Sequence, residues 1–95
     1  MFILNLTYCK PIAEVETYLA EHVAYLDKYY QTGKFICSGS KEPRIGGIII
    51  CRAHDRQEVE QMILEDPFSR EMVANYEIIE FTPSKYELAF APVVG

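Results

Sequence analysis

The sequence predicts an α+β domain in which strands and helices follow one another as β-α-β-β-α-β. Four short segments are rich in β-branched and aromatic residues, which favour strands. Two longer segments repeat apolar residues at steps of three and four, which is typical of amphipathic helices. This order is that of a ferredoxin-like sandwich, with an antiparallel four-stranded sheet and both helices on one face. The chain has 95 residues and no linker or repeat, so we expect a single domain over residues 1–95.

The first two elements are expected over residues 2–8 and 12–32. Residues 2–8, FILNLTY, are aromatic and branched, and Pro11 cannot continue a strand ladder. From residue 12 to 32 apolar side chains recur with helical spacing, while most charged residues fall on other faces. Gly33 then closes the helix, because glycine readily adopts the left-handed conformation wanted after the last turn.

A hairpin and a second helix come next. Residues 35–40 and 45–51 are expected to be strands, joined by the polar turn at 41–44, which contains a proline. Asp55 with Glu58 three residues later forms a capping-box pattern. A helix should therefore begin there and stop near residue 65.

Two prolines divide the last part of the predicted domain. Pro67 disfavours helical geometry at the residue before it, so the second helix breaks at this point. Residues 68–73 then suggest a short further helical segment. The fourth strand is expected over residues 76–81, and Pro83 ends it.

One face of the predicted sheet lacks a cover. Two helices protect only one face, yet the first and third strands carry apolar residues at consecutive positions. The tail at 83–95 is also strongly apolar. We therefore expect a homodimer, with the tail at the interface and further assembly left open.

Composition and charge exclude several classes of function. The net charge is −5 without a cluster of Lys and Arg, so nucleic acid is not an expected partner. The apolar run at the N-terminus is far shorter than a bilayer span and no basic leader precedes it, so we expect a cytoplasmic protein that does not bind membranes. The three cysteines, Cys9, Cys37 and Cys51, have no CxxC spacing, which argues against a disulfide framework and a zinc site and favours buried thiols.

His22 and Asp66 are the residues that point most directly to chemistry. His22 falls on the inward stripe of the first helix, where an aliphatic residue would pack better and a lone polar group needs a partner. A carboxylate on Nδ1 would orient the ring and leave Nε2 free as a base. The alternative is a structural histidine, and Asp66 before Pro67 is also an ordinary helix cap. We expect Asp66 to serve both as the helix cap and as the partner of His22. His54 is expected to be exposed to solvent.

Five further side chains are candidates for a substrate pocket. They are Ser38, Ser40, Lys41, Arg44 and Tyr8. Their hydroxyl groups and positive charges suit an anionic or phenolic ligand. The alternative interpretation is that the four hairpin residues form a solvated hairpin tip and that the tyrosine only packs against its neighbours.

Three short motifs together resemble the YciI-like family. They are EHxxYL at 21–26, the strand ending Ser38-Gly39, and DPF at 66–68. The resemblance implies a fold similar to muconolactone isomerase, a dimeric α/β barrel, and an active-site pair at His22 and Asp66. It also implies kinship with a dehydrochlorinase of a chlorinated hydroxyhydroquinone. Many members read SGP where this chain has Ser40 in place of the proline, so the rim of the pocket differs.

Two hypotheses about function follow from the site residues. In the first, the chain is a cofactor-independent lyase or isomerase that uses His22 and Asp66 as general acid and base on a small cyclic or phenolic substrate. No motif for a nucleotide cofactor or a phosphate loop occurs, and we expect no metal. In the second, the same pocket binds a small ligand without turnover, as in an accessory protein. A purely structural scaffold is a third reading, in which the pair serves folding.

Overall fold

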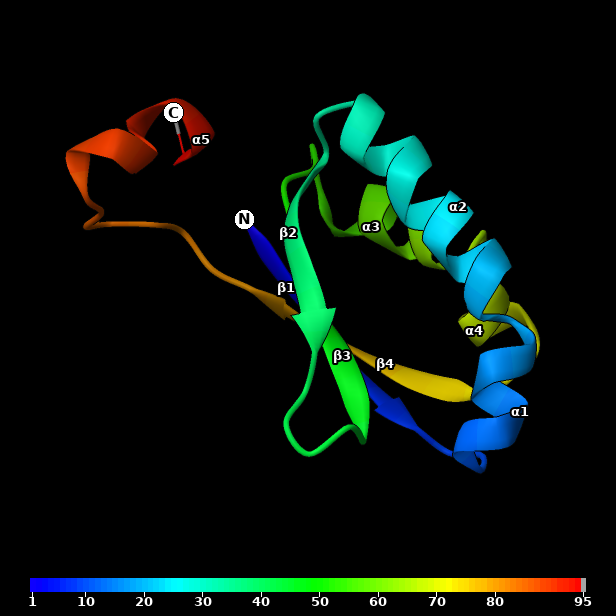
Figure 1. Cartoon of the computed structure of the whole chain (residues 1–95). Coiled ribbons are helices and arrows are strands. Elements are labelled where there is room, and N and C mark those ends of the chain that lie inside the picture. The colour runs from blue at the N-terminus through cyan, green and yellow to red at the C-terminus, as the bar shows by residue number, and fades with distance from the viewer. Residues whose placement is uncertain (95) are drawn as a thin grey trace.

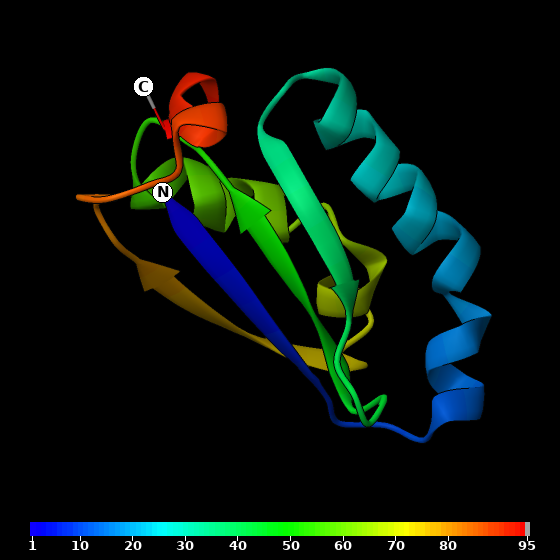
Figure 2. The same ribbon diagram turned by 60° about the vertical axis from the view of Figure 1, so that its left-hand side comes forward.

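The computed structural model describes residues 1–94 and has the α+β architecture expected from the sequence. The sheet has the strand order β2-β3-β1-β4, and all neighbouring strands are antiparallel, as Figure 2 shows. The predicted ferredoxin-like class is therefore confirmed. In chain order the elements are β1 (Phe2–Tyr8), α1 (Ile12–Thr17), α2 (Leu19–Gln31), β2 (Phe35–Ser40), β3 (Gly46–Cys51), α3 (Arg56–Ile63), α4 (Pro67–Arg70), β4 (Ala74–Glu80), the 3₁₀ helix η1 (Leu88–Phe90) and α5 (Ala91–Val94).

The core lies between the sheet and the helices α1–α4, which pack on the same side of it (Figure 1). Alternate residues of β1 face this side, and Phe2, Leu4 and Leu6 are almost completely buried. Period-two alternation is what a strand with one covered face requires. Val15 from α1 and Val59 from α3 meet the same core. The apolar pattern of the sequence thus decides which face of the sheet receives the helices.

The first helical region is divided into two helices rather than the single one predicted over 12–32. The backbone leaves helical geometry at Tyr18, where φ is −105° and ψ is 6°. Tyr18 is half-buried against the core, and its carbonyl accepts a hydrogen bond from the backbone N–H of His22 at 3.0 Å. His22 consequently lies in the first turn of α2. At the other end of α2, Gly33 has a φ of +78°, as expected for the residue after the last turn.

The two acidic caps lie where the sequence predicts them. Asp55 accepts a hydrogen bond from the backbone N–H of Glu58 at 2.9 Å at the start of α3. Asp66 accepts from the backbone N–H of Phe68 at 3.0 Å at the start of α4, with Pro67 in the first helical position. Both oxygens satisfy donors that a helix leaves free at its N-terminus. β4 begins two residues earlier than predicted, at Ala74.

The hairpin of β2 and β3 places two serines on the helix side of the sheet. A register shift between Phe35 and Cys37 is followed by the pairs Ser38 with Ile49 and Ser40 with Gly47. Because directly opposite residues share a face and Ile49 is buried in the core, Ser38 and Ser40 face the helices. The bulge therefore changes which side chains β2 presents to α2.

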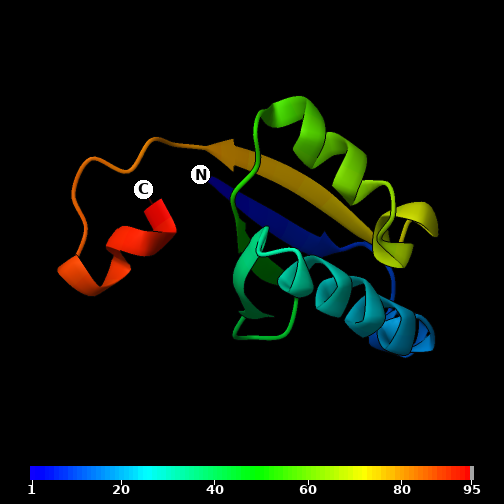
Figure 3. The same cartoon turned by 90° about the horizontal axis from the view of Figure 1, so that it is seen from above.

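Within residues 1–94, the opposite face of the sheet has no helix on it. Ile3 of β1 pairs with Ile50 and Ile79, so three isoleucines form a row across this face, and Ile79 is 42% exposed. The segment after β4, which includes η1 and α5, leaves the sheet and lies away from α1–α4 (Figure 3). Its large apolar side chains are exposed, with Leu88 at 87%. Among residues 1–94 no helix is long and apolar enough to cross a membrane.

The cysteines correct one expectation. Cys51 is buried, but Cys9 and Cys37 are exposed in this chain, so the predicted burial of thiols applies to one of the three. Cys37 follows the bulge in β2, and Cys9 lies just beyond β1 with its Sγ 3.1 Å from the carbonyl oxygen of Met72. Strand ends and edges leave side chains accessible that a central strand would cover.

Candidate active site

His22 and Asp66 lie in direct contact although 44 residues separate them. His22 Nδ1 is 2.8 Å from Asp66 Oδ1, and the His22 side chain is only 12% exposed. The Asp66 side chain is completely buried. With Asp66 ionised, the imidazole Nδ1–H is the donor in this contact, because a carboxylate can only accept hydrogen bonds.

The Asp66 carboxylate accepts hydrogen bonds from three donors on three elements. Oδ1 accepts from His22 Nδ1 on α2 and from the backbone N–H of Phe68 on α4. Oδ2 accepts from the hydroxyl group of Tyr76 on β4. Asp66 is thus both the cap of α4 and the partner of His22, because a carboxylate has enough lone pairs for both roles. Tyr76 was not among the predicted site residues; its position in a strand gives no sign that it reaches across to α4.

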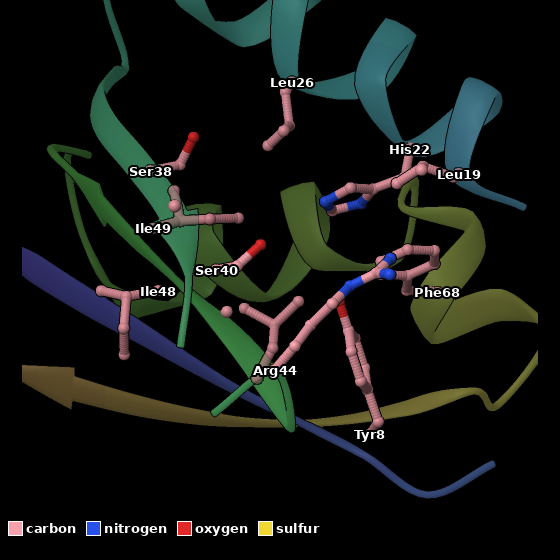
Figure 4. A pocket seen from close by; sticks show the side chains of 13 residues that line it. Tyr8, Leu19, His22, Leu26, Ser38, Ser40, Arg44, Ile48, Ile49 and Phe68 are labelled. Atoms are coloured by element: carbon pink, nitrogen blue, oxygen red, sulfur yellow. The ribbon is translucent and has the colours of Figure 1, made fainter. Parts of the chain in front are cut away.

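The imidazole ring of His22 is held on one face by Phe68. Their ring centroids are 4.0 Å apart and their planes differ by 5°. Tyr8 meets the same Phe68 ring edge-on, at a centroid distance of 6.0 Å. Within residues 1–94, His22 Nε2 has no hydrogen-bond partner, and in Figure 4 this nitrogen points into the cavity. The ring is therefore fixed at one nitrogen and open at the other.

The cavity in front of His22 has a volume of about 160 Å³ and mostly apolar walls. Four of the five residues predicted to bind substrate line it, namely Tyr8, Ser38, Ser40 and Arg44 (Figure 4). Lys41 is the exception, because its Nζ donates to Thr7 Oγ1 at 3.2 Å instead. The remaining lining comes from Leu6, Leu19, Leu26, Gly39, Gly47, Ile48, Ile49 and Phe68.

Besides His22, a few polar groups line the cavity among its apolar walls. Arg44 is the one cationic side chain among the lining residues, and its Nη1 forms an ion pair with Glu16 Oε1 at 2.9 Å. The Ser38 hydroxyl lies 2.6 Å from the hydroxyl of Tyr30 on α2. Hydroxyl groups from the hairpin and the guanidinium of Arg44 can meet an oxygen-bearing ligand while its ring contacts the apolar walls.

Two tyrosines, Tyr25 buried and Tyr76 half-buried, lie close enough to Asp66 to be affected by its charge. Burial raises the pKa of both Tyr25 and Tyr76 above the usual value, and the negative charge of Asp66 raises them further. Both hydroxyl groups therefore stay protonated at ordinary pH. The Tyr76 hydroxyl donates a hydrogen bond to Asp66, whereas the buried Tyr25 hydroxyl has no hydrogen-bond partner in the described part of the chain.

The other titratable candidates lie outside the cavity. His54 is exposed beside the start of α3, and its neighbour Asp55 is engaged as a cap. Cys9 is not among the cavity residues. Residues 1–94 hold no group of three histidine, cysteine or carboxylate side chains arranged to bind a metal ion.

Comparison with known proteins finds a family and solved structures of similar fold. The model of the YCII-related domain matches residues 1–82. One solved structure is that of the 5-chloro-2-hydroxyhydroquinone dehydrochlorinase from Burkholderia phenoliruptrix AC1100, in complex with 2,5-dihydroxybenzoquinone. It superposes with a TM-score of 0.67 at 20% sequence identity, over 85% of this chain and 93% of the other. At this identity the likeness shows a shared fold. No curated protein matches the sequence.

Proposed function

We propose that this chain, which belongs to the YCII-related family, is a cofactor-independent enzyme that moves a proton on a small cyclic or phenolic substrate. The observation that carries the proposal is the state of His22. Its Nδ1 is engaged by a buried carboxylate, while Nε2 is free and points into a cavity. A base must reach its substrate from a fixed position, and this arrangement leaves one nitrogen available to do so.

The proposed roles of the pair follow from its surroundings. Asp66 holds the proton on Nδ1, so the lone pair of Nε2 faces the cavity. When Nε2 takes a proton, the imidazolium is stabilised by the Asp66 charge. Phe68 limits rotation of the ring by stacking on it. Proton transfer by one positioned side chain accelerates a reaction by about 10²–10⁴-fold.

Two outcomes of the proton transfer suit this site. His22 Nε2 removes a proton from an acidic O–H or C–H group of the ring. In an elimination, the electron pair left behind forms a new double bond and a leaving group such as chloride departs with its own pair. In an isomerisation, the imidazolium returns the proton to another carbon, and the double bond changes position. Neither outcome requires an oxidant or a reductant.

The cavity supports a substrate of one ring. Its volume of about 160 Å³ is close to the roughly 150 Å³ of a cavity that accepts benzene. Tyr8, Ser38, Ser40 and Arg44 are proposed to bind the oxygen atoms of the substrate. Lys41 has no place in this proposal because it does not line the cavity. A solved protein of similar fold binds 2,5-dihydroxybenzoquinone, a ligand of this size and polarity.

The direct test is a substrate screen with matched variants. Chlorinated hydroquinones and unsaturated lactones are incubated with the protein, and chloride release and ultraviolet absorbance are followed. Turnover that is lost in His22→Ala and retained in His54→Ala supports the enzyme. If the wild type binds members of the panel without turning any of them over, the chain is a small-ligand binding protein instead.

We also propose that the functional unit is a homodimer formed through the open face of the sheet. The isoleucine row of Ile3, Ile50 and Ile79 lies on this face, and the apolar tail leaves β4 on the side away from the helices. Two such sheets facing each other would bury both rows, which is the arrangement of a dimeric α/β barrel. A single chain exposes these side chains to water.

A further inference from the structure

We propose that Tyr76 is a positioning residue, which holds the Asp66 carboxylate so that His22 presents Nε2 to the cavity. The inference rests on the proposed function, because it assigns a residue to the same pair. Tyr76 touches neither the cavity nor His22 by hydrogen bond, so its effect passes through Asp66. Its test uses a spectroscopic readout that does not depend on turnover.

The first step concerns how each carboxylate oxygen is held. Oδ1 has two donors, His22 Nδ1 and the backbone N–H of Phe68. Oδ2 accepts from Tyr76 and from no other group in the described residues. Without the Tyr76 hydroxyl, Oδ2 would be a buried acceptor with no partner, since the Asp66 side chain is completely buried.

The second step concerns rotation of the carboxylate. A terminal carboxyl group turns easily about its last bond because the torsion there is broad and two-fold. Turning would exchange the two oxygens or tilt both, and would lengthen the 2.8 Å contact with His22. Tyr76 opposes this from β4, where it pairs with Leu6 in a regular register and faces the helices. The sheet thereby fixes the plane of the carboxylate relative to α2.

The third step concerns the persistence of the donor. A phenol donates to a carboxylate only while it keeps its proton. Burial and the nearby Asp66 charge raise the pKa of Tyr76 above its usual value. The hydroxyl is therefore a donor over the whole range in which histidine changes its protonation.

Tyr25 provides a matched control for the removal of a hydroxyl group. It is buried in the same region, with its ring 6.2 Å from that of His22, and Asp66 raises its pKa as well. Its hydroxyl has no hydrogen-bond partner among the described residues. Tyr25→Phe therefore removes a buried hydroxyl that makes no hydrogen bond to Asp66, and Tyr76→Phe removes one that does.

The experiment is ¹⁵N NMR of the histidine rings at neutral pH in the wild type, Tyr76→Phe and Tyr25→Phe. The wild type should show His22 with the proton on Nδ1. In Tyr76→Phe the ring shifts should move toward a mixture with Nε2–H, while Tyr25→Phe should match the wild type. Unchanged shifts in Tyr76→Phe, or equal changes in both variants, would overturn the proposal.

A second substitution guards against a Tyr76→Phe protein that does not fold. 3-Fluorotyrosine placed at position 76 keeps the ring and makes the hydroxyl a stronger donor. The Nδ1 proton resonance of His22 should then shift, and a resonance identical to that of the wild type would contradict the positioning role.

Kinetics separate this inference from the proposed function. Once a substrate is in hand, Tyr76→Phe should lower kcat about tenfold with KM little changed, because substrate contacts stay intact. If His22→Ala abolishes turnover while Tyr76→Phe leaves both the ring chemical shifts of His22 and kcat unchanged, the proposed enzyme function is supported and the positioning role of Tyr76 is wrong. If the shifts move but no compound is turned over, Tyr76 positions the pair in a binding protein.

Discussion

Phe68 contacts His22 and Asp66 at the same time, through two different parts of the residue. Its ring stacks on the imidazole of His22 at a centroid distance of 4.0 Å, and its backbone N–H donates to Asp66 Oδ1 at 3.0 Å. The short sequence Asp66-Pro67-Phe68 therefore builds the cap, the helix start and one wall of the site together. A change at any of these three positions should affect both folding and the orientation of His22.

Asp66→Ala should destabilise the protein by more than a lost helix cap. A cap alone is worth about 1 kcal/mol. Here the substitution also leaves the buried hydroxyl of Tyr76 and Nδ1 of His22 without an acceptor, and the expected loss in the free energy of unfolding is about 3 kcal/mol. Urea denaturation measures it, with Asp55→Ala as the control for an exposed cap. A loss of about 1 kcal/mol in both variants would contradict the burial argument.

The two core tyrosines should respond differently to loss of their hydroxyl groups. Tyr76→Phe removes a donor from buried Asp66 Oδ2 and should cost about 1–3 kcal/mol. Tyr25→Phe removes a hydroxyl for which residues 1–94 provide no hydrogen-bond acceptor, and it should be neutral or stabilising. Midpoints of urea unfolding for the two variants give the comparison. Equal destabilisation would mean that the Tyr25 hydroxyl has a partner in solution.

The protein should lose stability as the pH rises above about 9. Burial raises the pKa of Cys51 from 9.0 to about 11 and, together with the hydrogen bond to Glu65, that of Tyr29 from 10.0 to about 12. Groups with a raised pKa hold their protons more tightly in the folded state. Their contribution is complete below the unfolded-state pKa and is lost as the pH rises through the folded-state value.

Urea unfolding at pH 8, 10, 11 and 12 tests this dependence, with phenolate absorbance recorded in parallel. Tyr29→Phe should be less sensitive to pH between 10 and 12 than the wild type, because one of the titrating groups is gone. Stability that stays constant up to pH 12 would show that these groups ionise equally well in the folded chain.

Arg44 should contribute to ligand affinity and Lys41 should not. Arg44 lines the cavity, while Lys41 is turned toward Thr7. With 2,5-dihydroxybenzoquinone as the probe, Arg44→Gln should raise Kd about tenfold, since a hydrogen bond to a charged group is worth about 1.5 kcal/mol or more. Lys41→Gln removes the same charge and should leave Kd nearly unchanged. Isothermal titration calorimetry measures both Kd values. Equal changes in Kd for the two variants would mean that Arg44 acts only through its charge and not through direct contact with the ligand.

A charge on the open face of the sheet should prevent the proposed dimer. Ile79→Glu places a carboxylate in the isoleucine row, where a facing sheet would bury it without a partner. Leu64→Glu is the control, because Leu64 is 63% exposed at the end of α3, on the helix side of the sheet. Sedimentation equilibrium should find a dimer for the wild type and Leu64→Glu and a monomer for Ile79→Glu. A monomeric wild type would contradict the dimer itself.

The sequence by itself determined most of the elements and most of the residues of the candidate site. Local patterns predicted the strands because alternation depends only on neighbouring residues, and the caps at Asp55 and Asp66 because a side chain reaches the next turn without help from the fold. It also placed His22 on an inward helical face. The break at Tyr18 was missed, since apolar spacing continues through it and nothing in the local sequence marks a change of backbone geometry there.

Only the tertiary structure decided which groups meet around the carboxylate. Tyr76 reaches Asp66 because β4 runs antiparallel to β1 and packs against α4. Lys41 does not line the cavity because the hairpin turn directs its side chain to Thr7. The bulge in β2 likewise turns Ser38 and Ser40 toward α2. These contacts join distant segments, and their geometry depends on strand register and packing, for which no short stretch of sequence carries a signal.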